Sequence, residues 1–298
     1  MSIMSIESTP SNAPADLPWA GRPGAAGYWN GFRAAVGHAL QLMLRRQRLV
    51  LAFAIALFPV LLPLATVMFS SAQFAEGGNK IFVQLVEQLH IDALGPLLAL
   101  FFATMLIGEE VEGQTMIYIL TRPLPRSAWI LGRYAAYVLI ASVILAISIL
   151  LTFAASTTLP NFGFNFTDVK LMLHYLAVAV VAVAVYGSFT MFLGAVVRWP
   201  IVIGVVVLYG WQRLATMVPG VVDFLTIKKY TNALLPVLAT QRGNEAVQAI
   251  LAGFQREEFL VGATKAVIIL VLLTALFLGC TIATVRFREY AKGRAVGS

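Results

Sequence analysis

The sequence GEEVEGQTMIYILTRPLPRSAWILGR, residues 108–133, joins two strongly apolar segments and decides how the rest of the chain is interpreted. It begins with acidic residues, continues through a short amphipathic run, and ends with two prolines and three arginines. The apolar segments on both sides have the composition expected of transmembrane helices. We therefore interpret this stretch as a polar connection between two membrane spans.

The composition is that of a membrane protein. Of the 298 residues, 59% are hydrophobic and 12% are charged, whereas a soluble domain carries about 25% charged residues. The formal charge of +7 could indicate nucleic-acid binding, but the basic residues flank apolar runs and do not form one soluble patch. We expect an all-α, polytopic membrane protein that binds no nucleic acid.

Six apolar segments are expected to cross the membrane within a domain that covers residues 49–285. The predicted spans are residues 49–69, 93–107, 128–156, 170–197, 201–218 and 263–285. Residues 70–92 are expected to form a polar loop, which would place His90 outside the membrane. Residues 219–261 are too charged to cross, and we expect short helices there, on or dipping into the outer leaflet.

The residues before the first span divide into two parts. Residues 1–27 are rich in Pro, Ser, Ala and Gly, which predicts a disordered tail. In residues 28–48, apolar side chains recur at steps of three and four, which favours an amphipathic helix in the headgroup plane. An extension of the first span is the alternative, but it would place the arginines of residues 45–48 deep in the membrane.

The distribution of basic residues predicts the topology. Arginines collect at both ends of the chain and in the connections after the second and fourth predicted spans. By the positive-inside rule, both termini, the basic tail 286–298 and the stretch 108–133 are expected to be cytoplasmic. The expected location is the inner (cell) membrane of a bacterial-type cell.

No catalytic or metal-binding constellation is recognisable. The chain has no phosphate-binding loop of the Walker A type. Its histidines, His38, His90 and His174, have no acid placed to orient them, and Cys280 is the only cysteine. We expect no catalytic residue, no metal site and no cofactor in this chain, and an integral membrane enzyme is the least favoured alternative.

Polar residues inside the predicted spans are candidates for a substrate pathway. Ser148, Thr152 and Ser156 recur at every fourth position and share a face of the third span. Ser188 and Thr190 lie among small residues on the fourth span. Close helix packing through small and hydroxyl residues is the competing explanation.

Arg213 is a further candidate. It lies about 20 Å into the fifth predicted span at 1.5 Å per residue. An ionisable group at that depth indicates a functional site by default. The side chain can instead snorkel outwards if the helix ends shortly after it.

The stretch 108–133 also has the features of a docking element. Large aliphatic side chains follow the expected bend at Gly113, at Met116, Ile117 and Leu120. The two prolines then end this short helix and return the chain to the membrane. Ordinary solvated loops rarely expose several large aliphatic side chains.

This stretch resembles the ABC-2 type permeases, the membrane subunits of ATP-binding-cassette transporters. The matching pattern is an acid-rich end of the second span, then E-x-E-G-x-T, then L-[ST]-R-P. The residues that carry it are Glu110, Glu112, Gly113, Thr115, Leu120, Thr121, Arg122 and Pro123. The family often places the Gly directly before the Thr, whereas Gln114 separates them here.

The resemblance implies that the stretch contains a coupling helix seated on a separate ATPase subunit. It implies two ATPase chains, which bind ATP and Mg²⁺, and a second permease copy, identical or paralogous. Membrane lipids surround the spans. The implied coupling residues are Glu109, Glu110, Glu112, Gly113, Thr115, Met116, Ile117, Leu120, Arg122 and Pro123.

We therefore expect a non-catalytic permease subunit that couples ATP hydrolysis on its partner to substrate movement, with export favoured and the substrate open. The alternative is ATPase-driven mechanotransmission, or remodelling of an external partner protein at residues 219–261, without transport.

Overall fold

The computed structural model describes residues 25–69, 78–112, 125–159, 162–217, 224–235 and 261–287. Those residues are helical apart from short connections. The elements are α1 (Ala25–Met43), α2 (Arg46–Phe69), α3 (Gly78–Leu85), η1 (Val86–Leu94), α4 (Gly95–Leu98), η2 (Ala99–Ala103), α5 (Thr104–Glu112), α7 (Arg126–Ser156), α8 (Phe166–Val196), α9 (Pro200–Val205), η3 (Val206–Trp211), α10 (Gln212–Met217), α11 (Ile227–Asn232) and α14 (Ala263–Phe287). The predicted all-α class is confirmed for this part of the chain.

Five helices are long and apolar enough to cross a membrane. They are Arg46–Ala65, Gly78–Gly108, Arg126–Ser156, Phe166–Val196 and Ala263–Arg286. They overlap the first, second, third, fourth and sixth predicted spans. Residues 1–24 and 288–298 of the predicted tails and most of the segment 219–261 lie outside the described residues. Residues 25–27 of the first predicted tail belong to α1, and residues 286–287 of the second belong to α14.

The second span is much longer than predicted. Helix begins at Gly78 and continues without interruption to Glu112, with η1 and η2 in the wider π-helical form. The prediction of a loop over residues 70–92 was therefore wrong from residue 78 onwards. Phe82, Val86 and Leu94 are buried in the core, but the polar residues between them lower the local hydropathy and hide the helix.

The fifth predicted span is shorter than a full crossing. Its apolar part, Pro200–Trp211, is 12 residues long, whereas about 20 are needed to cross the hydrocarbon. The helix continues as α10 with Gln212, so the polar part follows directly. A sixth full span is not confirmed.

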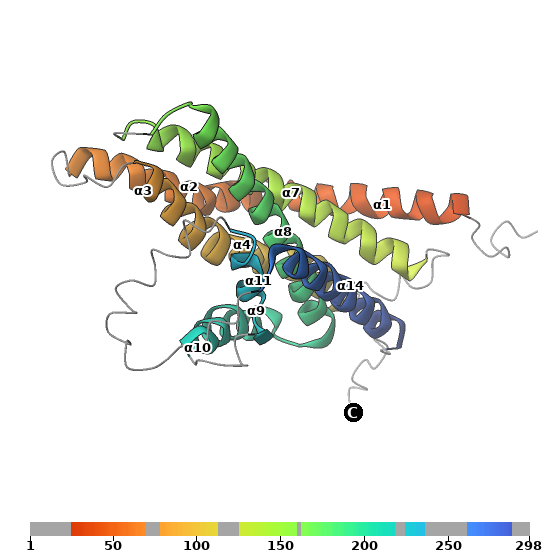
Figure 1. The fold of residues 1–298 in the computed structure, drawn as a ribbon. Helices are drawn as coiled ribbons and strands as arrows, with labels where there is room; N and C mark the ends of the chain where they lie inside the picture. Colours follow the sequence, from red (N-terminus) through yellow and green to blue (C-terminus); the bar gives the residue numbers. More distant parts are fainter. Residues whose placement is uncertain are drawn as a thin grey trace, which may run out of the picture.

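Of the five spans, the second span and α8 are the most buried, and α2 and α14 are the least buried. Figure 1 shows α8 in the middle of the molecule, between α7 and α14. In the most apolar windows, 67% of the second span and 61% of α8 are buried, but only 22% of α2 and of α14. The large apolar side chains that α2 and α14 leave exposed, such as Phe58 and Leu272, are suited to lipid contact.

Two glycines allow close approach between helices. A Cβ atom on Gly187 of α8 would lie 1.9 Å from Cε1 of Tyr137 on α7. A Cβ atom on Gly132 of α7 would lie 2.8 Å from Cβ of Ala35 on α1. Only a residue without a side chain permits these crossings.

Helix α1 is separate from the first span, because the helix breaks at residues 44–45. It runs along α7 (Figure 1) and buries small residues, Ala35 and Ala39, together with Met43. The alternative of a simple extension of the first span is therefore wrong.

Candidate coupling end and intramembrane polar cluster

Most of the predicted coupling segment lies outside the described residues. This applies to Gly113, Thr115, Met116, Ile117, Leu120, Arg122 and Pro123. The backbone of the three glutamates, 109, 110 and 112, forms the last turn of α5, and α7 resumes at Arg126. The structure therefore describes the two helices that flank the segment.

Arg133 joins these two flanking helices. Its side chain is completely buried near the start of α7, and its guanidinium group donates a hydrogen bond to the backbone carbonyl oxygen of Leu106 on α5. The same group lies over the ring of Trp129, with Cζ 4.2 Å from the ring centroid. Arginine suits this position because its planar group can stack and donate at the same time.

The helix α1 contributes a titratable group beside Arg133. His38 is exposed, but contact with the bundle removes part of its hydration, and this desolvation lowers the pKa of His38 below 6.5. The positive charge of Arg133 lowers this pKa further. The packing of α1 at Gly132 brings the two residues together.

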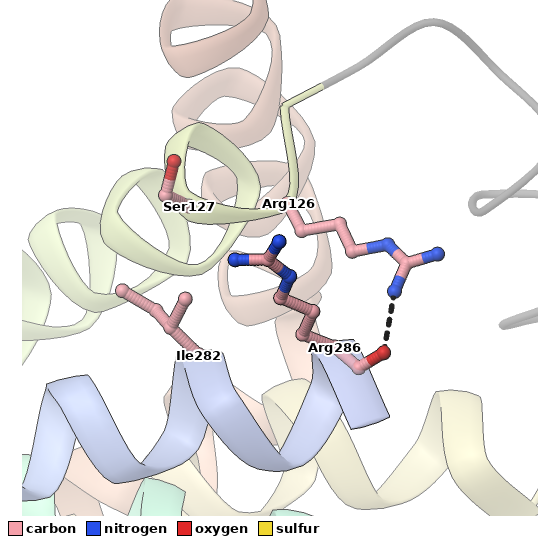
Figure 2. A pocket seen from close by; sticks show the side chains of 4 residues that line it. All are labelled: Arg126, Ser127, Ile282 and Arg286. Atoms are coloured by element: carbon pink, nitrogen blue, oxygen red, sulfur yellow. Dashed lines mark hydrogen bonds between the residues drawn. The ribbon is translucent and has the colours of Figure 1, made fainter. Parts of the chain in front are cut away.

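Arg126 connects the start of α7 to the end of α14. One of its terminal nitrogens donates to the carbonyl oxygen of Arg286 at 2.9 Å and to that of Val285 at 3.5 Å. Figure 2 shows the first of these hydrogen bonds. Carbonyls in the last turn of a helix lack partners within the helix, so Arg126 supplies a cap. We call the end of the bundle where α5, α8 and α14 end and α7 and α9 begin the basic end.

The hydroxyl stripe predicted on the third span is present and buried. Ser148 donates to the carbonyl oxygen of Ala56 on α2. Thr152 donates to the Ser148 carbonyl oxygen at 2.9 Å, and Ser156 to that of Thr152 at 2.7 Å. All three side chains are essentially inaccessible in the chain.

His90 completes this cluster, contrary to its predicted place in an outer loop. It lies in η1 and is fully buried. Its Nε2 is 3.0 Å from Ser148 Oγ and 3.4 Å from Thr152 Oγ1. Its Nδ1 is 3.4 Å from the carbonyl oxygen of Leu85, so a backbone group orients the ring. Within the part of the chain that the structure describes, this arrangement lacks the acid of a serine–histidine–acid triad.

The hydroxyl groups on α8 make contacts within the bundle. Ser188 donates to the Val185 carbonyl oxygen at 2.8 Å, and Thr190 to that of Ala99 in η2 at 3.1 Å. Both are buried. Of Arg213, the structure describes only the backbone, in α10.

An ion pair that the sequence did not reveal connects α11 to the second span. Lys228 Nζ lies 2.5 Å from Asp92 Oδ2, where η1 widens the helix. Beside it, the Tyr209 hydroxyl group donates to the carbonyl oxygen of Ala93 at 2.6 Å. Asp92 was missed because the sequence prediction placed this residue in a loop. With the second span at its true length, Asp92 is an acid inside a span.

The described residues contain no group of His, Cys, Asp and Glu that could hold a metal ion. No curated protein matches the chain at a significant level. The family model of the ABC-2 family transporter proteins matches residues 42–210, which is more than half of the chain and extends from α1 into η3. The chain therefore belongs to the ABC-2 family of transporter proteins, and its apolar spans agree with this assignment.

Proposed function

We propose that this chain is the permease subunit of an ATP-binding-cassette transporter, in which ATP hydrolysis on a separate ATPase subunit drives export of a substrate. The family supports a non-catalytic membrane subunit of such a transporter. The observation that carries the coupling proposal is the hydrogen bond from Arg133 to the Leu106 carbonyl oxygen. It joins the two helices that flank the predicted coupling segment, so a force on that segment acts on both helices together.

The coupling surface consists of the residues that the family pattern marks. The glutamates at the end of α5 and Arg122 make polar contacts with the ATPase, and Met116, Ile117 and Leu120 fill its groove. ATP and Mg²⁺ bind to the two ATPase chains, and the complex contains a second permease copy. Both termini and the basic end face the cytoplasm, as the arginines at this end support.

Co-purification of the ATPase tests this proposal. Met116→Asp places a charge on the aliphatic docking face and is expected to abolish recovery of the ATPase with the tagged chain, while the amount of chain in the membrane is unchanged. Gln114→Asp is the matched control, because it adds the same charge two residues away in the same segment. Equal recovery of the ATPase with Met116→Asp and with the unaltered chain would contradict the proposal.

The hydrogen bonds of the hydroxyl stripe support packing more than a pathway lining. Ser148, Thr152 and Ser156 all donate to backbone carbonyl oxygens, which leaves little capacity for a passing substrate. If Ser148, Thr152, Ser188 and Thr190 do line a pathway, their alanine variants lower transport at unchanged stability. If they serve packing, stability falls first.

The ion pair between Lys228 and Asp92 favours one second candidate, mechanotransmission to an external partner protein. It connects α11, in the segment between α10 and α14, directly to the second span, which in turn leads to the coupling segment. Movement of α5 can therefore reach residues 219–261 without a substrate pathway. Crosslinking an external protein to this segment in an ATP-dependent manner, with no substrate transported by reconstituted vesicles, would favour this candidate over transport.

A further inference from the structure

A cavity lies at the basic end between the start of α7 and the end of α14. Arg126, Ser127, Ile282 and Arg286 line it, and its volume is about 490 Å³. Figure 2 shows Arg126 and Ser127 on one wall and Ile282 and Arg286 on the other. The cavity is thus formed by two helices from distant parts of the sequence.

The charge of this cavity favours an anion. Among the described residues that line it, two are arginines and none is acidic. The described hydrogen bonds of Arg126 go to the carbonyl oxygens of residues 285 and 286 and not to a carboxylate. Guanidinium groups at a cavity attract an anion, because they carry positive charge and several hydrogen-bond donors.

The position of the cavity favours a lipid headgroup over a free ion. Arg126 is the first residue of α7, and Arg286 is the last residue of the apolar span in α14, so both lie where two spans leave the hydrocarbon. Further into the same span, α14 exposes large apolar side chains such as Leu272 and Leu276, against which acyl chains can lie. Ile282 makes one wall of the cavity itself apolar.

We propose that this cavity binds the phosphate group of an anionic phospholipid, with Arg126 and Arg286 as its cationic partners and Ser127 as a hydroxyl donor. Basic pockets between spans on the cytoplasmic side are the usual sites for such headgroups. The lipid joins the helix after the coupling segment to the last span. This proposal does not depend on the ATPase coupling proposed above.

The test is native mass spectrometry of the purified full chain, titrated with phosphatidylglycerol and, separately, with phosphatidylcholine. Arg286→Gln is the informative variant, because it removes one guanidinium group but keeps the backbone carbonyl that Arg126 caps. One basic residue near the membrane surface contributes about 1 kcal/mol, so the variant is expected to bind phosphatidylglycerol about fivefold more weakly. Binding of phosphatidylcholine is expected to stay the same.

Arg198→Gln is the matched control. Arg198 is an exposed arginine at the same end of the bundle, after α8, and it is not part of the cavity. Arg286→Lys keeps the charge and is expected to retain most of the binding, which distinguishes a lost ligand contact from a folding defect.

Three outcomes would overturn the proposal. Equal weakening by Arg198→Gln would show a general attraction to the basic end. Full displacement of the lipid by millimolar inorganic phosphate would identify a free-phosphate site. Unchanged lipid binding, together with loss of the co-purified ATPase in Arg286→Gln, would assign the arginines to an acidic surface of a partner protein.

Discussion

Lys228 Nζ lies 2.5 Å from Asp92 Oδ2, and this contact fixes α11 against the π-helical part of the second span. Both side chains are largely enclosed, with 26% and 14% of their surface accessible. A charge in such a place is costly without its partner. The pair therefore contributes to holding α11 against the bundle.

Removing one member of this pair should cost more than removing both. Asp92→Asn is expected to lower the stability by up to about 3 kcal/mol, because it removes the carboxylate that the partly enclosed Lys228 contacts. The double variant Asp92→Asn, Lys228→Gln is expected to be more stable than Asp92→Asn alone. Thermal unfolding in detergent measures both, and additive losses would show that the two residues do not interact.

The crossing of α7 and α8 should not tolerate a side chain at Gly187. A Cβ atom there would meet the ring of Tyr137, and Tyr137 is itself fixed by a hydrogen bond from its hydroxyl group to the Val183 carbonyl oxygen at 3.0 Å. Gly187→Ala is expected to lower stability by about 1–3 kcal/mol through overpacking. Gly279→Ala is the control, because a Cβ atom at Gly279 has no neighbour within 4 Å; equal effects of the two changes would contradict the close crossing.

Lysine should not replace Arg133. An ammonium group cannot stack over the Trp129 ring and also donate to the Leu106 carbonyl oxygen as the guanidinium group does. We expect Arg133→Lys to lower stability by about 1–2 kcal/mol and to uncouple ATP hydrolysis from transport. The exposed Arg198→Lys is the control, and wild-type behaviour of Arg133→Lys in both assays would remove the role assigned to this residue.

The docking of α1 should weaken as the pH falls. Because the pKa of His38 is lower in the folded chain than its usual 6.5, the unfolded chain binds more protons in the interval between the two values. The contribution of His38 to the stability of the folded chain is therefore complete above pH 6.5. It is lost as the pH falls from 6.5 through the lower pKa of the folded chain. Hydrogen exchange of α1 as a function of pH measures this, and His38→Gln is expected to remove this component of the pH dependence; an unchanged profile in that variant would exclude His38 as the cause.

The composition and the long apolar runs were enough to predict an all-helical membrane protein and the existence of five spans, because lipid leaves few alternatives to a helix for an apolar run of this length. The start of the second span was not predicted correctly. The motif around Glu112 and Arg122 was enough to indicate the family. These features are local, since each depends on residues that are neighbours in the chain.

Only the tertiary structure decided where the polar residues of the bundle lie. His90 and Asp92 read as loop residues, because η1 carries too many polar groups for a span that is judged by hydropathy alone. They become buried because partners from distant segments, Ser148 and Lys228, satisfy them there. Arg133 likewise lies near the start of a span, and it is enclosed because the Leu106 carbonyl oxygen and the Trp129 ring are brought against its guanidinium group. A sequence shows that such groups exist, but the cost of burying them depends on partners that the folded chain alone brings together.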